Sequence, residues 1–172
     1  AFSPKASLAY QASDDWALRG SFGRGTRFPT VGELFKNIGI TAVGGGTPTP
    51  AQIAGFPAPY NSTTPTNNPN LKPESADSWE FTAERFLESG LWRTSLFGED
   101  KRDALISQSD TTTLPGFTFT TVQNVDKVRS YGIETSLQTK DMLIRGLDLS
   151  GSVAYIKSTI VKDSMNPLLE NT

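Results

Sequence analysis

The chain of 172 residues contains neither cysteine nor histidine. Without cysteine there is no disulfide framework and no thiolate metal site. Without histidine the Ser-His and Cys-His nucleophile pairs, the usual zinc ligand sets and the commonest general base are excluded. An enzyme is therefore the least supported function class, and we predict no catalytic residue, no cofactor and no metal ligand.

The sequence also lacks an excess of charge of one sign, and it lacks long apolar runs. The 16 Lys and Arg nearly balance the 18 Asp and Glu, so charge gives no argument for a nucleic-acid partner. No apolar segment approaches the roughly 18 residues of a transmembrane helix. The first residues lack the basic start and apolar middle of a signal peptide and resemble the interior of a strand. We therefore expect the chain to begin and end within a longer protein.

The sequence is rich in segments that alternate between apolar and polar residues. Residues 5–12 and 16–23 alternate on either side of the turn signal Asp14-Asp15, which predicts a β-hairpin. Each segment has about the length of a tilted strand that crosses a bilayer, roughly 9 to 11 residues. Further strands are predicted from residue 75 and over residues 91–109, 117–140 and 147–155, with turns at 87–90, 111–116 and 141–146. The sequence thus predicts an all-β antiparallel meander of about six long strands in three hairpins.

A long insert, residues 23–74, interrupts this pattern. A single helical turn is plausible over residues 30–37, while Gly44-Gly45-Gly46 and repeated prolines exclude any long regular element further on. A mobile surface loop is the plain structural interpretation for most of residues 40–67. The aromatic residues Phe56 and Tyr60 within it are candidate ligand-binding residues, because exposed aromatic side chains often contact ligands.

Two architectures share this alternation. In a soluble β-sandwich the apolar faces meet in a core, whereas in an outer-membrane barrel they meet lipid. The strands are long for a sandwich, turns alternate between short and long, and aromatic residues lie near strand ends, as in an interfacial girdle. These aromatic residues are Tyr10, Trp16, Trp79, Trp92 and Tyr155. The barrel is favoured, and a soluble or secreted sandwich that binds carbohydrate or protein is the alternative.

Specific motifs strengthen the barrel interpretation. Residues 24–35 (Arg-Gly-Thr-Arg-Phe-Pro-Thr-Val-Gly-Glu-Leu-Phe) resemble the FRAP-x-x-x-EL segment of TonB-dependent outer-membrane receptors. Residues 68–75 (Asn-Pro-Asn-Leu-Lys-Pro-Glu-Ser) are similar to the NP-x-L-KPE segment of those receptors, and residues 97–107 and 124–137 resemble their LFY…D-x-I and N…GxE strands. The matching motif positions are Arg27, Phe28, Pro29, Glu33, Leu34, Asn68, Pro69, Leu71, Lys72, Pro73, Glu74, Gly132 and Glu134.

The resemblance implies a fold, a location and a set of partners. It implies part of a 22-stranded transmembrane β-barrel in the bacterial outer membrane, in contact with lipid, with residues 23–74 as a long extracellular loop. It also implies uptake of a scarce nutrient, commonly a ferric siderophore, energised by the TonB complex through a plug domain that these residues lack. Six strands cannot close such a barrel, so this chain alone is not expected to transport and is expected to self-associate through its strand edges.

The charged motif residues have two open interpretations. Arg24 and Arg27 with Glu33, and Lys72 with Glu74, either face the lumen and hold the loop or plug, or only anchor strand ends and cap the short turn over residues 31–35. The prolines of the motifs fix backbone direction where strands end, so we interpret the motifs as structural first. The acidic residues Glu99, Asp100 and Asp103 do not have the spacing of a calcium loop and are interpreted as a solvated strand end.

Overall fold

A computed structural model describes residues 2–35, 38–58, 60–61, 68–142 and 144–172. The chain forms two compact units. The first consists of Ala1–Thr26, Ser75–Arg102 and Asp126–Thr172, and the second of Arg27–Glu74 and Asp103–Val125. The helices in the described part of the chain have neither the length nor the apolar composition needed to cross a membrane.

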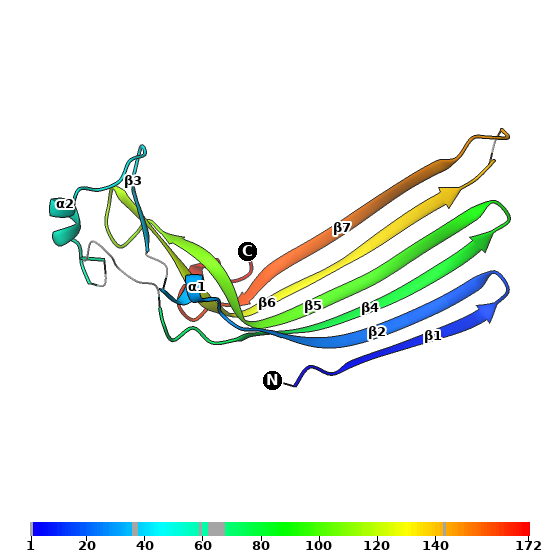
Figure 1. The fold of residues 1–172 in the computed structure, drawn as a ribbon, viewed down its shortest axis with the longest axis horizontal. Coiled ribbons are helices and arrows are strands. Elements are labelled where there is room, and N and C mark those ends of the chain that lie inside the picture. Colours follow the sequence, from blue (N-terminus) through cyan, green and yellow to red (C-terminus); the bar gives the residue numbers. More distant parts are fainter. Residues whose placement is uncertain (1, 36–37, 59, 62–67, 143) are drawn as a thin grey trace. The chain divides into compact units, whose positions relative to one another are not determined.

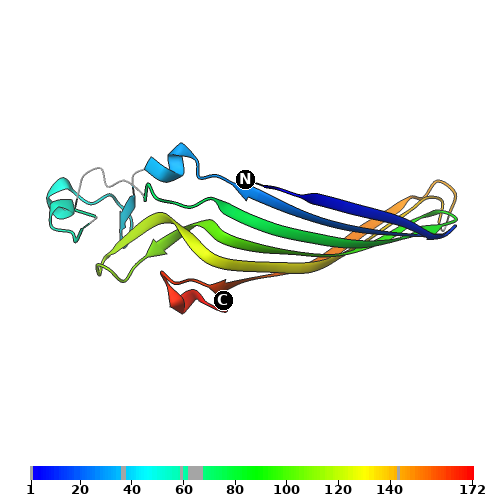
Figure 2. The ribbon, with the colours of Figure 1, turned by 90° about the horizontal axis from the view of Figure 1, so that it is seen from below.

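The first unit is a ladder of antiparallel strands. Its strands belong to β1 (Lys5–Ser13), β2 (Trp16–Arg27), β4 (Glu74–Leu87), β5 (Gly90–Asp110), β6 (Phe117–Thr139) and β7 (Leu149–Lys162). In Figure 1 they lie side by side in that order, as the strand pairing requires, and Figure 2 shows them curving together as one layer. A short 3₁₀ helix, η1 (Pro167–Leu169), follows β7. The three predicted hairpins are confirmed.

The strand register separates an apolar face from a polar face. Ala6 is paired with Phe22, Phe81 with Leu96, and Ile133 with Tyr155, so apolar residues meet apolar residues across strands. The side chains of this face are largely exposed, including those of Phe81 and Tyr155. A β-sandwich would require a second sheet to cover them, but all seven strands of the described chain belong to one sheet. The sandwich alternative is therefore wrong.

Large aromatic side chains lie over glycines on both faces of the ladder. On the apolar face, the indole of Trp79 covers Gly98, its register partner. On the polar face, the ring of Phe97 covers Gly132, which is buried. An aromatic ring placed over a strand glycine replaces the packing that the missing side chain would supply.

The second unit contains a seventh strand that the alternation pattern did not predict. The elements here are α1 (Val31–Phe35), β3 (Gly39–Ala42) and α2 (Pro50–Ala54). β3 pairs antiparallel with β6, bringing Ile40 opposite Phe119, and the two lie side by side in Figure 1. The helical turn predicted over residues 30–37 is present over residues 31–35, while residues 36–37 lie outside the described part.

The surface loop expected over most of residues 40–67 contains short regular elements and a small core that the sequence did not predict. Residues 40–42 belong to β3, and Thr49 caps α2 in a capping box with Gln52. Ile38, Phe56 and Phe119 form a small buried core, which further apolar residues surround. These are Ile40, Ile53, Tyr60, Leu114 and Phe117. Burial of apolar surface against β6 folds this segment, and residues 59 and 62–67 lie outside the described part.

Candidate ligand-capture site

The first motif builds a cap at the start of α1. Glu33 Oε2 accepts hydrogen bonds from the Thr30 backbone N–H (2.8 Å) and from its hydroxyl (3.0 Å), while Thr30 Oγ1 accepts from the Glu33 N–H (3.2 Å). Arg27 donates to Glu33 Oε1 at 2.5 Å. The backbone bond from Thr30 and then the bond from Arg27 hold the pKa of Glu33 below its usual value. The charges of this motif are thus satisfied within it, while Phe28 is exposed and Leu34 partly buried.

The second motif is fastened to β6 by the side chain of Asn124, the asparagine of the N…GxE segment, and the sequence did not predict this contact. Its Oδ1 accepts from the Lys72 N–H (2.8 Å), and its Nδ2 donates to the carbonyls of Lys72 (3.0 Å) and Asp103 (2.8 Å). Glu74 Oε2 accepts from the Leu105 N–H at 2.9 Å, which adds a second connection to β5. The motif therefore holds together chain segments about 50 residues apart.

The remaining residues of this motif support the same anchor. Asn68 Oδ1 accepts from the Asn70 N–H (2.9 Å), an Asx turn that precedes the buried side chain of Leu71. The Lys72 ammonium lies 3.7 Å from Asp103 Oδ1. Asp103 itself has a φ of 50°, a left-handed conformation that aspartate tolerates better than most residues. Pro69 and Pro73 are exposed beside this anchor.

The two candidate ligand-binding residues lie in one aromatic cluster. The centroid of the Phe56 ring is 4.8 Å from that of Phe117 and 5.7 Å from that of Phe119. The Tyr60 ring stacks on the Phe119 ring with 4.1 Å between the centroids. Phe56 is 7% exposed and belongs to the core, whereas Tyr60 is partly exposed at its edge. Burial, and secondly the charge of Asp110, raise the pKa of the Tyr60 phenol. Tyr60 is thus the more accessible of the two side chains.

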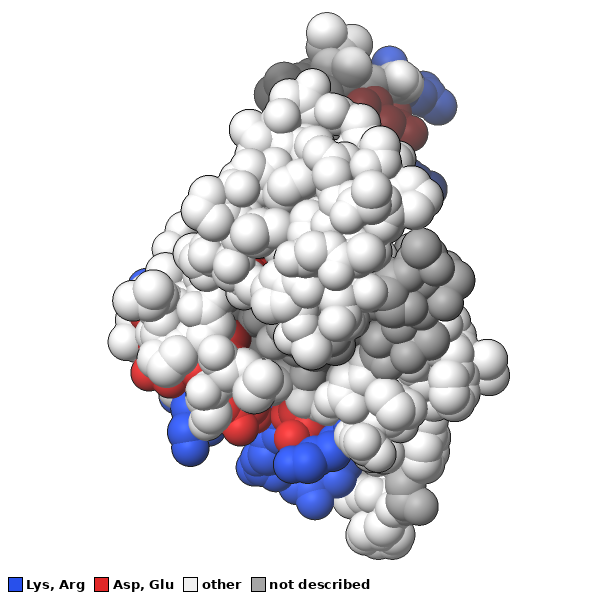
Figure 3. Space-filling model, turned by 90° about the vertical axis from the view of Figure 1, so that its left-hand side faces the viewer, with Lys and Arg blue, Asp and Glu red and all other residues white. Residues whose placement is uncertain are grey.

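Charged side chains are scarce in the part of the sequence that surrounds this cluster. Residues 37–71 and 111–125 contain no Lys, Arg, Asp or Glu. Figure 3 looks onto the side of the second unit that carries α2 and β3, and the nearest surface there is almost entirely uncharged. Asp110 lies between these two segments of the sequence, and its carboxylate accepts bonds from Thr113 and Thr112, which lower its pKa to about 2. This carboxylate is thereby committed to the turn that follows β5.

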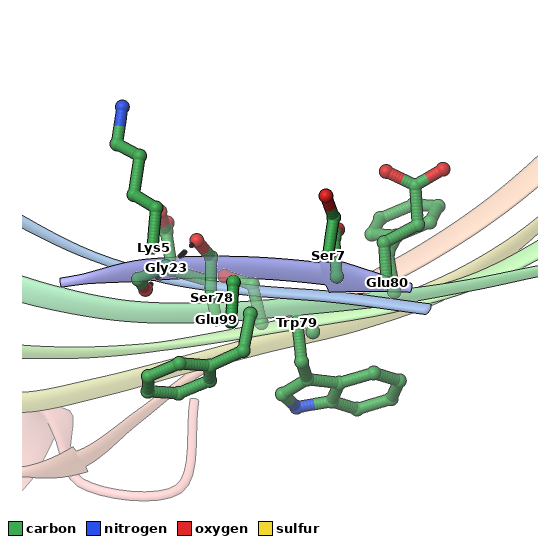
Figure 4. A pocket seen from close by; sticks show the side chains of 13 residues that line it. Lys5, Ser7, Gly23, Ser78, Trp79, Glu80 and Glu99 are labelled. Atoms are coloured by element: carbon green, nitrogen blue, oxygen red, sulfur yellow. Dashed lines mark hydrogen bonds between the residues drawn. The ribbon is translucent and has the colours of Figure 1, made fainter. Parts of the chain in front are cut away.

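The polar face of the first unit is lined by small and hydrophilic side chains. Figure 4 shows Lys5, Ser7, Ser78 and Glu80 projecting from one side of the sheet around a shallow hollow, with Trp79 on the other side. The Ser78 hydroxyl donates to the Gly23 carbonyl at 3.3 Å. Such a face is suited to contact with water.

A buried carboxylate lies further along the same face. Glu84 has only 3% of its side chain exposed and is held by Arg93 (2.7 Å) and Arg19 (3.1 Å). The motif residue Glu134 lies on the polar face as well, exposed beside Ser136. Gly132, two residues before Glu134 in β6, lies under the ring of Phe97 as described above.

The acidic residues Glu99, Asp100 and Asp103 do not form a joint site. Glu99 pairs with Lys101 (3.2 Å) and Asp100 with Arg129 (2.7 Å), while Asp103 faces Lys72. Among the described residues, no three Asp, Glu, His or Cys side chains gather so that they could hold a metal ion. These carboxylates serve ion pairs.

Comparison with protein families identifies the chain. The model of the TonB dependent receptor-like β-barrel matches residues 1–170. The chain belongs to the TonB-dependent receptor family. Receptors of this family are outer-membrane β-barrels that serve nutrient uptake. A comparison with curated proteins finds no match.

Solved TonB-dependent receptors have the same arrangement of strands. The copper transporter OprC is 18% identical with a TM-score of 0.65, over 93% of this chain and 21% of its own. The siderophore receptor PirA from Pseudomonas aeruginosa is 15% identical with a TM-score of 0.66, and the match covers 93% of this chain and 28% of that receptor. The FrpB iron transporter from Neisseria meningitidis is 14% identical with a TM-score of 0.62, and the match covers 96% of this chain and 20% of that transporter. At these identities the likeness shows the fold, and the chain spans between 20% and 28% of each receptor.

Proposed function

We propose that this chain is a section of an outer-membrane receptor that takes up a scarce nutrient, a ferric siderophore or a similar metal chelate. The observation that carries the proposal is the family match over residues 1–170. The names of the structural neighbours, which include a siderophore receptor and an iron transporter, support the ligand class. The TonB complex would energise transport through a plug domain in another part of the receptor.

The apolar face supports a position in the membrane. From Trp16 to Phe22, β2 rises by about 20 Å, which is close to the apolar band of roughly 25 Å in outer-membrane barrels. At the ends of the strands that meet in short turns, the ring centroids of Trp16 and Trp92 lie 6.5 Å apart. Trp79 contacts Phe81 nearer the ends of the strands that run into the long connections. Aromatic residues at both limits of an apolar band correspond to the two interfaces of a bilayer.

The second unit supports a role in ligand capture. It consists of the long connection from β2 to β4 and of the ends of β5 and β6 with the turn between them, and long connections are extracellular in outer-membrane barrels. Its partly exposed Tyr60 lies in a stretch of the sequence, residues 37–71, that contains no charged residue. Such a surface contacts the organic part of a chelate by apolar and aromatic packing. Tyr60 would touch the ligand, and Phe56 would hold the surface in shape.

The free edges of the sheet indicate how the section fits its receptor. β1 and β7 each have one described neighbour only, β2 and β6 respectively. An exposed edge pairs readily with another strand. In the whole receptor the neighbouring strands of the barrel would fill these edges, while the isolated chain would expose them and self-associate.

The test uses the full-length receptor that contains this chain. A strain without the receptor is complemented with it, and uptake of radioactive iron is measured with a panel of iron chelates under iron restriction. We expect uptake of one chelate that stops when the TonB complex is inactivated, with the receptor heat-modifiable in the outer-membrane fraction. A receptor in the soluble fraction, or uptake that is independent of TonB, would refute the proposal.

A further inference from the structure

Two ion clusters lie on neighbouring strands of the first unit. In the Asp77 cluster, Arg24 donates two hydrogen bonds to the carboxylate, at 2.5 and 2.8 Å, and Arg102 lies 3.4 Å from it. In the Asp100 cluster, Arg129 donates two bonds, at 2.7 and 2.9 Å, and Lys127 lies 3.4 Å away. Each carboxylate is therefore shared between two cations.

The two clusters form one belt. Asp77 and Asp100 are register partners, so the clusters are adjacent across β4 and β5. Together they extend over the consecutive strands β2, β4, β5 and β6. The members of this cationic belt are Arg24, Asp77, Asp100, Arg102, Lys127 and Arg129.

The cationic belt lies on the apolar face, next to its aromatic limit. Asp77 precedes Trp79 by two residues, and Arg129 precedes Tyr131 by two, so each shares a face with an aromatic residue of the band. The belt also lies toward the ends of the strands that run into the long connections, because Arg24 and Asp77 flank residues 27–74 in the sequence. In an outer-membrane barrel this level is the interface of the outer leaflet.

The belt carries an excess of exposed positive charge. Four cations share two carboxylates, which leaves two positive charges without an acidic counterpart in the belt. The carboxylates are the more covered partners, with 18% and 28% of their side chains exposed. Three of the cations are more exposed: 40% of the side chain of Arg24, 53% of that of Arg102 and 51% of that of Arg129 are accessible to solvent. An exposed cation beside an apolar band can reach anionic lipid headgroups.

We propose that the cationic belt binds the phosphate groups of outer-leaflet glycolipid, that is, of lipopolysaccharide. Arginine is suited to phosphate because its planar guanidinium donates parallel hydrogen bonds to two oxygens. Arg102 and Lys127 are the principal contacts, since the other two cations already make bidentate bonds to carboxylates. The acyl chains of the same lipid lie against the apolar side chains below the belt, such as Trp79 and Tyr131.

This inference depends on the proposed membrane position, and its test is separate from the test of transport. The full-length receptor is purified in detergent and stripped of lipid, and its dissociation constant for lipopolysaccharide is measured. The double variant Arg102→Gln/Lys127→Gln leaves both bidentate pairs in place. Because one cation near an anionic lipid surface is worth about a fivefold change in affinity, we expect the dissociation constant to rise roughly 25-fold.

Lys101 provides a matched control. It lies between Asp100 and Arg102 in the chain but on the polar face, where it pairs with Glu99 at 3.2 Å. Lys101→Gln therefore removes one positive charge from the opposite face of the sheet. We expect that variant to bind lipopolysaccharide as the unmodified receptor does. An equal loss in Lys101→Gln, or no loss in the double variant, would overturn the proposal.

The chemistry of the ligand is tested separately. Lipid A from which both phosphates have been removed is expected to bind at least tenfold more weakly, and inorganic phosphate at the same concentration is expected not to displace lipopolysaccharide. Equal binding of the dephosphorylated lipid, or displacement by inorganic phosphate, would overturn the assignment to lipid phosphate. A receptor that is heat-modifiable and takes up its chelate would still uphold the proposed function in either case.

Discussion

Asp77 on β4 and Asp100 on β5 stand directly opposite each other in the sheet, and each is held by a different arginine. Two like charges in such a cross-strand pair destabilise a sheet. Arg24 binds Asp77 from β2, and Arg129 binds Asp100 from β6. The opposed carboxylates therefore connect four consecutive strands, and the repulsion between them is offset by charge-assisted bonds on both sides.

A methyl group at Gly132 should destabilise the barrel. A Cβ there would lie 2.5 Å from the Tyr155 carbonyl oxygen and 2.7 Å from Phe97 Cζ, and the backbone atom cannot move aside cheaply. We expect Gly132→Ala to lower the free energy of unfolding by about 1–3 kcal/mol, measured as a lower temperature of heat modification in the full-length receptor. Gly151→Ala on β7, where a Cβ would meet nothing within 4 Å, is the control. Equal behaviour of the two variants would contradict the packing role of Gly132.

Removal of the Asn124 side chain should release the second motif. Asn124→Ala leaves the Lys72 N–H and the carbonyls of Lys72 and Asp103 without this partner. We expect the free energy of unfolding to fall by about 1–3 kcal/mol. We expect faster protease cleavage near residues 68–74 of the intact receptor. Gln123→Ala removes a bond to the nearby Thr121 and should leave cleavage unchanged. Unchanged cleavage in Asn124→Ala would show that the motif is held by other contacts.

Acid should loosen the turn after β5. The pKa of Asp110 is about 2 in the folded chain and about 3.9 in an unfolded chain, so ionised Asp110 stabilises the turn above about pH 4. This stabilisation is lost as the pH falls from 4 to 2. Amide hydrogen exchange of residues 110–116 should therefore show protection that decreases in this window. In Asp110→Asn the protection should be lower at neutral pH and no longer follow this titration.

Substitutions of the two aromatic candidates should have different effects. Phe56→Ala removes a buried ring from a core of few residues, with a cost of about 3–5 kcal/mol, so we expect protease cleavage within residues 40–61. Tyr60→Ala removes a partly exposed ring and should leave that segment folded, while the affinity for the chelate falls about tenfold. Binding assays and limited proteolysis on the same receptor preparations distinguish the two. Unchanged affinity in Tyr60→Ala would exclude it as a ligand contact.

The sequence by itself determined the class of the fold and the family. The period-two alternation of residues 5–12 and 16–23 is a local property of a strand with one apolar face, so it predicted the hairpins correctly. The motif at residues 68–75 identified the family, because several residue types at fixed spacing form a specific signal. The absence of histidine and cysteine turned the functional interpretation away from catalysis, because the common nucleophile pairs and zinc sites require these residues.

Only the tertiary structure decided which distant residues meet. β3 pairs with β6 across about 80 residues, Asn124 binds Lys72, and Phe56 is buried on Phe119 in a segment whose glycines and prolines indicated a loop. The cationic belt likewise requires Asp77 opposite Asp100, which depends on the register of β4 and β5. Alternation shows the face on which a side chain lies, whereas its partner is set by strand pairing, and pairing depends on contacts along the whole sheet.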